Sequence, residues 1–417
     1  MIKAARLHTL LGAAASAILA VASAEAQELA GSQVERGRYL TYAGDCQACH
    51  TDIENEGIPY AGGRGLSTPF GVIYTPNLTP DDETGLGRWS RDDFYKAMNE
   101  GVGREGEHLY PAFPYPYFTN MPREDVDAIF DYLRTLEPVR SEKPENELPF
   151  PLNIRQAVAG WKLLFFEEQD FSVDPAQSAE WNRGRYLVDG PAHCGACHTG
   201  KNLLGADVEE EYLRGGLLEN WFAPNIRGGN NGGLAHWDAR DIVEFLRDGR
   251  SRHTAPMQRM GEVVELSTQH LTDADLGAIA AYLKSLDDSP RPKATAIDQA
   301  QQQRGEAIYF DNCASCHEAD LSGVEYFFAP LDKSNKVAAE DPSTVIRLIL
   351  EGARAQPTEN APTPLSMPSF AWKLDDEQVS DLVSFLRHRA GRGAGAVDAS
   401  EVAAMREYLI EHERSSP

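Results

Sequence analysis

One pattern occurs three times: Cys46-Gln47-Ala48-Cys49-His50, Cys194-Gly195-Ala196-Cys197-His198 and Cys313-Ala314-Ser315-Cys316-His317. These segments contain all six cysteines of the 417-residue chain, so chance clustering is negligible. Cys-x-x-Cys-His is the attachment motif of c-type haem, in which the two thiols bond one haem and the histidine is the proximal ligand of its iron. We expect three covalently bound haems c, with His50, His198 and His317 on the irons.

Paired cysteines also occur in redox disulfides and in structural zinc sites. Thioredoxin-like disulfides belong to βαβ patterns, which this sequence lacks. A zinc site needs four ligands, usually with a second Cys or His pair at short spacing. No second pair lies close to any of the three segments, so haem attachment is favoured.

The composition is that of a water-soluble globular protein. The hydrophobic fraction is 42%, the charged fraction is 25%, and the formal net charge is −25. These values exclude a polytopic membrane protein, a disordered chain and a collagen-like chain. A surface this acidic repels phosphate backbones and disfavours nucleic-acid binding.

The N-terminus has the pattern of a secretory signal peptide. Lys3 and Arg6 precede an uncharged apolar run from Leu10 to Ala22, and small residues follow it. Cleavage after Ala24 or after Ala26 fits the A-x-A rule, and we favour Ala26, which predicts a signal peptide over residues 1–26. The alternative, an uncleaved anchor, is disfavoured because the run is shorter than the ~20 residues of a spanning helix.

A helical pattern recurs around each Cys-x-x-Cys-His segment. An Arg-Gly dipeptide opens each unit, at Arg36-Gly37, Arg183-Gly184 and Arg304-Gly305. A second helix is predicted to start at Ser90, Asp238 and Asp341-Pro342, and to end at Gly101, Gly249 and Gly352. A third helix carries an apolar stripe at helical spacing, over 126–136, 276–286 and 379–386. A polar final helix is expected from Ser400 to about Arg414.

A sixth ligand decides whether a haem only transfers electrons or also binds small molecules, and methionine is typical of electron transfer. We therefore looked for a methionine between the second and third helix of each unit. The third unit offers Met367, which precedes Pro368. The second offers Met257 and Met260, both in an expected loop, and spacing alone does not choose between them.

The first unit offers Met98 and Met121. Met98 falls inside the second helix, where a core methionine is the simpler interpretation. Met121 lies just before the third helix and is favoured, with His108 as its competitor. The other histidines have ordinary interpretations, His193 packing near haem and the rest at the surface, namely His236, His253, His270, His388 and His412. No motif of a substrate-oxidising site is present.

Beyond these motifs, the sequence resembles the trihaem cytochrome c subunits of membrane-associated bacterial dehydrogenases of alcohol, gluconate, sorbitol, fructose or aldehyde. The matching segments lie at 75–81, 87–90, 108–115, 161–166, 180–184, 260–264 and 367–372. The resemblance of 260–264 to the ligand loop of the second unit favours Met260. Some relatives carry Met where this chain has Phe113, and some end in an apolar anchor where Glu401–Pro417 is polar.

The resemblance implies an all-α fold of three tandem class I cytochrome c-like domains. We place domain 1 at 27–140, domain 2 at 180–287 and domain 3 at 301–390. An inter-domain segment over 141–179, a linker over 288–300 and a C-terminal tail over 391–417 complete the chain. The implied metal ligands are His50 with Met121, His198 with Met260, and His317 with Met367.

The resemblance also implies a role as an electron relay in the periplasm, peripheral on the outer face of the inner membrane. The implied partner is a dehydrogenase large subunit of flavin, PQQ or molybdenum type, and the implied acceptor is membrane ubiquinone. We hypothesise that Leu163-Leu164-Phe165-Phe166 contacts the partner or the membrane, the alternative being a plain inter-domain core. Two other functions stay open: a multihaem peroxidase with one open haem, and a standalone soluble electron carrier.

Overall fold

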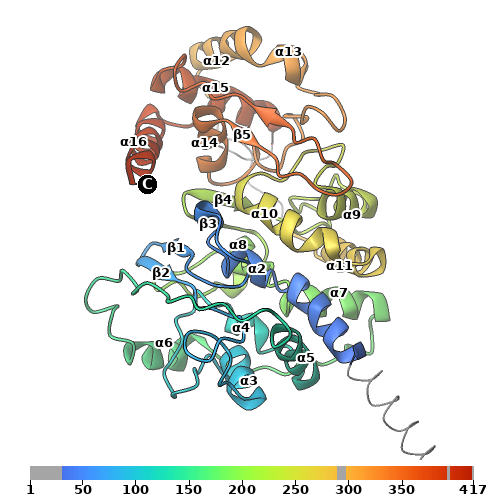
Figure 1. The fold of residues 1–417 in the computed structure, drawn as a ribbon. Helices are drawn as coiled ribbons and strands as arrows, with labels where there is room; N and C mark the ends of the chain where they lie inside the picture. Colours follow the sequence, from blue (N-terminus) through green and yellow to red (C-terminus); the bar gives the residue numbers. More distant parts are fainter. Residues whose placement is uncertain (1–30, 289–296, 392–394, 416–417) are drawn as a thin grey trace, which may run out of the picture.

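The computed structural model describes residues 31–288, 297–391 and 395–415, which form three helical units in sequence order (Figure 1). The predicted signal peptide over 1–26, with its cleavage site, lies outside these residues, as does most of the predicted linker over 288–300. None of the helices in the described ranges has both the length and the apolar character needed to cross a bilayer.

Unit 1 contains the first Cys-x-x-Cys-His segment. Its elements are a helix at residues 31–43, α2 (Cys46–Cys49), η1 (Ile53–Asn55), β1 (Gly65–Thr68), β2 (Gly71–Tyr74), α3 (Arg91–Glu100), α4 (Tyr115–Phe118) and α5 (Arg123–Leu133). β1 and β2 form an antiparallel hairpin with Gly65 opposite Tyr74. A further helix, α6 (Ala157–Phe165), lies in the segment that leads to unit 2.

Unit 2 repeats this order with one additional helix. Its elements are α7 (Ala179–Asp189), α8 (Gly195–His198), η2 (Glu209–Glu211), β3 (Gly215–Leu218), β4 (Trp221–Pro224), α9 (Ala239–Asp248), α10 (Gln258–Leu266), η3 (Thr268–His270) and α11 (Asp273–Ser285). β3 and β4 pair as in unit 1, with Gly215 opposite Pro224.

Unit 3 has the shortest stretch of chain between its first helix and its closing helix. Its elements are α12 (Gln299–Asn312), α13 (Ala314–His317), α14 (Ser343–Glu351), β5 (Ala353–Arg354), β6 (Ser366–Met367), α15 (Asp376–Ala390) and α16 (Ala399–Ser415). The β5–β6 pair follows α14 rather than the Cys-x-x-Cys-His segment, and it places Met367 opposite Ala353.

The Arg-Gly dipeptides mark the point where the first and closing helices of each unit cross. In unit 2, a β-carbon on Gly184 would lie 1.9 Å from the carbonyl oxygen of Ala278, so only glycine permits this approach. Arg183 pairs with Asp275 of the same closing helix at 2.7 Å. The corresponding ion pairs of the other units are Arg36–Asp125 and Arg304–Asp381. The repeated dipeptide therefore locks one helix crossing in each unit.

The predicted second helices are confirmed in all three units. Ser90 and Asp238 each begin their helix with a capping box, which satisfies free backbone N–H groups at the N-terminus. Gly101 and Gly249 end α3 and α9 with φ of 61° and 65°, a conformation that favours glycine. In unit 3 the helix starts at Ser343, one residue after Pro342.

Three features differ from the sequence-based expectation. The fold is mostly but not wholly helical, since three two-stranded antiparallel sheets occur in the described residues. Their strands have four residues or two, too short to show a period-two pattern.

α12 begins at Gln299, inside the predicted linker. The predicted final helix is confirmed as α16, but Val402 and Met405 are buried in the core of unit 3 rather than in a free tail.

Each unit has its own apolar core, and the first two cores are joined. The closing helices α5, α11 and α15 bury the apolar stripes that the sequence predicts. The core of unit 2 includes Ala43, and Tyr39 packs against it, both from the first helix of unit 1. Tyr39 also donates a hydrogen bond to Asp275 at 2.6 Å. Units 1 and 2 therefore share a packed interface.

Candidate haem-binding sites

The three motif histidines have one environment in common. The Nδ1 atom of His50 lies 2.7 Å from the carbonyl oxygen of Pro76, and that of His198 lies 2.7 Å from Pro224 O. His317 Nδ1 lies 2.8 Å from Ala329 O. A carbonyl oxygen can only accept, so Nδ1 carries the proton and Nε2 keeps a free lone pair. This is the arrangement in which a histidine ligates a metal through Nε2 while a second group fixes its ring.

The hairpins explain how these carbonyl oxygens reach the histidines. Pro224 ends β4, and Pro76 follows β2 by two residues, so each hairpin returns the chain to its own motif. In unit 3 a single bridge between Val324 and Phe328 performs the same turn before Ala329. Sequence reasoning missed the hairpins, and with them the partner of each ring.

Burial keeps all three histidines neutral. It lowers the pKa of His50 to about 4, and it also lowers the pKa of His198 and of His317. Burial removes water from the ring and so disfavours the charged form. A neutral imidazole is the form that binds iron.

The cysteines are six free thiols, two in each motif. Burial raises the pKa of Cys46 and Cys49 to about 12, and that of Cys197 to about 11. A redox-active dithiol has the opposite character, a lowered pKa that favours the thiolate. Zinc needs four ligands, and in the described part of the chain no three His, Cys, Asp or Glu side chains are placed to hold a metal ion. Two thiols outside any disulfide, beside a histidine with a free Nε2, therefore fit covalent haem attachment better than either alternative.

Comparison with known proteins agrees with this geometry. The family described as Cytochrome c matches residues 34–137, 182–287 and 302–390. The chain belongs to the cytochrome c family. Each matched range contains one Cys-x-x-Cys-His segment, so haem c is the cofactor that the family and the donor set indicate.

Several relatives of this cytochrome c chain are similar over most of their length. The gluconate 2-dehydrogenase cytochrome c subunit of Pantoea cypripedii is 40% identical, with 89% of each chain covered. The cytochrome c subunit of the quinone alcohol dehydrogenase of Gluconobacter oxydans (strain 621H) is 36% identical over 94% of this chain and 87% of its own. The fructose dehydrogenase cytochrome subunit of Gluconobacter japonicus is 34% identical, covering 89% and 82%. The resemblance to cytochrome c subunits of bacterial dehydrogenases is thereby confirmed.

The methionines predicted as sixth ligands lie in three different settings. Met367 is half-buried in β6, packed against the core of unit 3. Met260 lies in α10 and Met257 directly precedes that helix, so the expected loop is helical. α10 packs against α2 of unit 1. Met260 and Met367 stay predictions as iron ligands.

Met121 occupies a position with equivalents in both other units. Its side chain is 2% exposed, and it directly precedes the N-cap residue of α5. Leu271 occupies the same position before α11, and Leu374 occupies it before α15. Each is followed five residues later by a buried aliphatic residue, the spacing of a hydrophobic staple. Met121 therefore has a packing role that leucine performs elsewhere, and its role as a ligand stays a prediction.

His108, the competitor of Met121, forms a short β-bridge with Val102. Val102 directly follows the glycine that ends α3. Met367 is bridged in the same way to Ala353, just after the glycine that ends α14. The Nδ1 atom of His108 is buried and has no hydrogen-bond partner among the described residues. This makes His108 the second residue to test in unit 1.

Two histidines expected at the surface have specific contacts. His253 lies 3.1 Å from Asp241 and stacks on Trp237 with ring centroids 4.9 Å apart. His270 lies against Tyr42 of unit 1, with centroids 4.4 Å apart. Both therefore have packing roles that a single sequence does not reveal.

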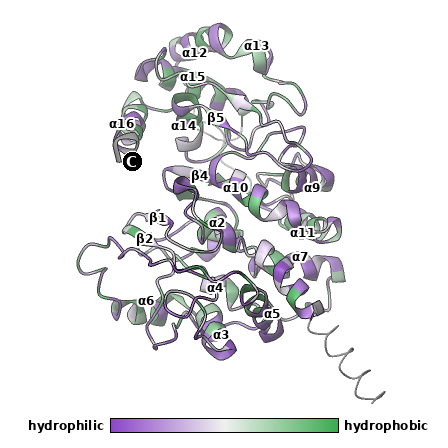
Figure 2. Ribbon diagram, in the orientation of Figure 1, coloured by the Kyte–Doolittle hydropathy of each residue, from purple (hydrophilic) through white to green (hydrophobic). Residues whose placement is uncertain are grey.

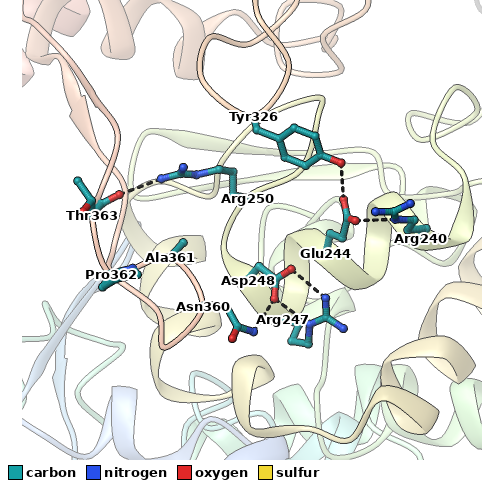
Figure 3. A pocket seen from close by; sticks show the side chains of 10 residues that line it. All are labelled: Arg240, Glu244, Arg247, Asp248, Arg250, Tyr326, Asn360, Ala361, Pro362 and Thr363. Carbon is teal, nitrogen blue, oxygen red and sulfur yellow. Dashed lines mark hydrogen bonds and ion pairs between the residues drawn. The ribbon is translucent and has the colours of Figure 1, made fainter.

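An open cavity of about 1010 Å³ lies between units 2 and 3 (Figure 3). Residues of α9 form one wall and loops of unit 3 form the other. Four of its charged groups form two ion pairs, Arg240 with Glu244 and Arg247 with Asp248. Tyr326 donates to Glu244 across the units at 3.1 Å. The cavity contains none of the predicted haem ligands and is held together by its own ion pairs.

Proposed function

We propose that this chain is the electron-transfer subunit of a dehydrogenase complex, relaying electrons through three covalent haems c. The observation that carries the proposal is the threefold recurrence of two free thiols beside a histidine whose Nδ1 is held by a backbone carbonyl. The relatives support it, since they are cytochrome subunits of gluconate, alcohol and fructose dehydrogenases.

The chain supplies the attachment and the ligands. Each haem c, when bound, takes up and releases one electron at its iron. The thiol pairs at 46/49, 194/197 and 313/316 would hold the haems, and His50, His198 and His317 would each supply a ligand to an iron. Met260 and Met367 would supply the second protein ligand to the second and third haem irons, and Met121 would supply that of the first. Neutral, buried histidines keep the ligand form available over the physiological pH range.

The proposed partner is a dehydrogenase large subunit of flavin, PQQ or molybdenum type that oxidises a sugar, alcohol or aldehyde. The predicted export signal would place the relay in the periplasm, at the outer face of the inner membrane, with ubiquinone as the acceptor. We further propose α6 as the face that approaches the membrane or partner. Leu163 is 87% exposed and Leu164 is 69% exposed, and the helix is largely apolar (Figure 2).

The alternative for the α6 segment, a plain inter-domain core, applies to only part of it. Phe166 packs edge-on against Tyr115 with ring centroids 5.0 Å apart. Leu163 and Leu164 do not share this burial. Two adjacent apolar side chains in water are costly unless something covers them, which favours a contact surface.

The direct test is a haem count on the exported, purified holoprotein. We expect three haems per chain by the pyridine haemochrome method. Replacing Cys313 and Cys316 with Ala should leave two, whereas Ser315→Ala in the same segment should leave three. A colourless product, or a wild-type count below three, would contradict the attachment sites.

The relay role needs a second measurement. Substrate should reduce the haems only when the dehydrogenase large subunit is present, and that subunit should co-purify with this chain. Turnover of peroxide by the isolated protein, with a high-spin ferric haem, would instead indicate a peroxidase. Full activity as a carrier without any bound large subunit would indicate a standalone protein.

A further inference from the structure

The haem-binding segments of units 1 and 2 touch one another. His193 directly precedes Cys194, and its Nε2 lies 3.3 Å from the carbonyl oxygen of Gly44, two residues before Cys46. The two segments come from different units, 149 residues apart in the sequence. In Figure 1, α2 and α8 lie together at the centre of the molecule.

The backbone and the neighbours of His193 fix its side chain at this junction. Its φ is 33°, an unusual value for a residue with a β-carbon, and the peptide groups around it are hydrogen-bonded to Gly190 and Ala196. The ring packs edge-on against Phe118 of unit 1, with centroids 5.4 Å apart. Burial lowers the pKa of the ring, which therefore stays neutral and donates to the carbonyl.

A second contact joins unit 1 to the interior of the unit 2 motif. Tyr117 of α4 lies over Gly195, so that a β-carbon there would be 2.7 Å from the tyrosine oxygen. The same hydroxyl donates to Asp207 of unit 2. Two groups of unit 1 therefore contact the second motif: Gly44 O contacts His193, which precedes the motif, and Tyr117 contacts Gly195, which lies inside it.

The motif of unit 3 is not part of this junction. Unit 3 docks on β4 through α14, where the Thr344 hydroxyl accepts from Phe222 N at 2.8 Å and donates to Phe222 O at 2.9 Å. Arg347 adds a bond to Glu219 O at 2.9 Å. Two charged groups act on the Cys313 thiol, namely Cys316 and Lys373. Both belong to unit 3 itself.

We propose that the haems of units 1 and 2 form an electronically coupled pair, with His193 as its positioning residue, and that the third haem behaves as a separate centre. This inference rests on the proposed function. Thioether bonds fasten the edge of each porphyrin to its own Cys-x-x-Cys segment. Contact between two such segments would therefore bring two porphyrin edges to the same junction, and the bond from His193 to Gly44 O holds the two segments together there.

Low-temperature EPR during a stepwise reductive titration of the full holoprotein tests the pair. Reducing one member should change the line shape and the apparent potential of the other, while the third haem titrates as an isolated low-spin centre. Met367→His should shift only the isolated signal and thereby identify it as unit 3. Three independent signals in the wild type would contradict the proposal.

The role of His193 is tested by two substitutions of similar size. His193→Leu removes the donor and should reduce or abolish the coupling, whereas His193→Gln keeps an N–H donor and should retain it. His270→Leu is the matched control, since that histidine packs on Tyr42 in the same unit 1–unit 2 interface without touching a motif. Equal coupling in His193→Leu and His270→Leu would show that His193 does not position the pair.

The failure of this inference can be distinguished from the failure of the proposed function. A haem count below three would contradict the attachment sites, whereas three haems without coupling would contradict only the pair. If His193→Leu does not accumulate, the wild-type titration alone decides whether the pair exists, and Tyr117→Phe, which removes the hydroxyl bonded to Asp207, is the second variant to compare with it.

Discussion

The carbonyl oxygen of Ala278 lies 1.9 Å from the point where a β-carbon on Gly184 would stand. The first and closing helices of unit 2 therefore cross with no space for a side chain, and the same close approach occurs at Gly37 and Gly305. Since the crossing shapes the whole unit, its disruption should be visible in stability rather than only in local structure.

We predict that Gly184→Ala destabilises the protein by about 1–3 kcal/mol, because the helices must separate to admit a methyl group. Gly277→Ala is the matched control on α11: its β-carbon would meet only Glu180 Oε1, at 3.8 Å. Alanine there should stabilise the helix by about 0.5–1 kcal/mol. Chemical denaturation of the two variants checks both signs, and equal effects would show that the crossing does not require glycine.

Met121→Leu tests the sixth ligand of the first haem. If Met121 ligates the iron, one of three low-spin haem signals should be lost. Leucine holds the equivalent position in units 2 and 3, so the packing cost should stay below about 1.5 kcal/mol. EPR and visible spectra provide the readout. Met98→Leu is the control, a buried methionine of α3 that should leave all three signals in place. Survival of every signal in Met121→Leu would make His108 the next candidate.

Lys336 should make stability depend on pH at the boundary between units 2 and 3. Its ammonium donates to Thr254 Oγ1 and to Ala255 O, both at 3.2 Å, and burial lowers its pKa to about 8. The native state loses this proton before the unfolded state does, so the penalty is complete below pH 8 and is relieved as the pH rises toward the unfolded pKa.

Stability should therefore increase between about pH 8 and 10, by up to about 3 kcal/mol. Urea denaturation across that range measures the slope. Lys336→Met removes the titrating group and should flatten this part of the profile. A wild-type profile as flat as that of the variant would show that the lysine is not perturbed.

The exposed face of α6 should matter for electron delivery but not for folding. We predict that replacing Leu163 and Leu164 with Ser lowers quinone reduction in membranes and leaves the haem content unchanged, because an apolar contact is removed without a core change. The control replaces Phe310 and Phe327 of unit 3 with Ser; they are 51% and 59% exposed. Equal quinone reduction in the two double variants would eliminate α6 as a contact surface.

Much of the site could be predicted from sequence because its chemistry is local. Cys46, Cys49 and His50 occupy one helical turn and its end, so their spacing alone specifies their use. The capping residues Ser90 and Gly101 act on adjacent backbone groups, and their effect is equally readable. These predictions depend on interactions within a few residues of each other.

The rest depends on contacts between distant segments. The carbonyl of Pro76 that orients His50 is 26 residues away and reaches it through a hairpin too short to have a pattern. The packing role of Met121 depends on the structural equivalence of α5, α11 and α15, which a single helix does not reveal. The contact of His193 with Gly44 joins two units, and no periodicity within one unit predicts such a contact.

The sharing of core residues between units 1 and 2 limits how far the chain can be dissected. A fragment beginning at Ala179 would lack Tyr39 and Ala43, and the part of the unit 2 core that they pack against would be exposed to solvent. Unit 2 is therefore not a self-sufficient module, because residues of unit 1 complete its core. Any rearrangement that separates units 1 and 2 would expose this core to solvent as well as interrupt the path of the electrons.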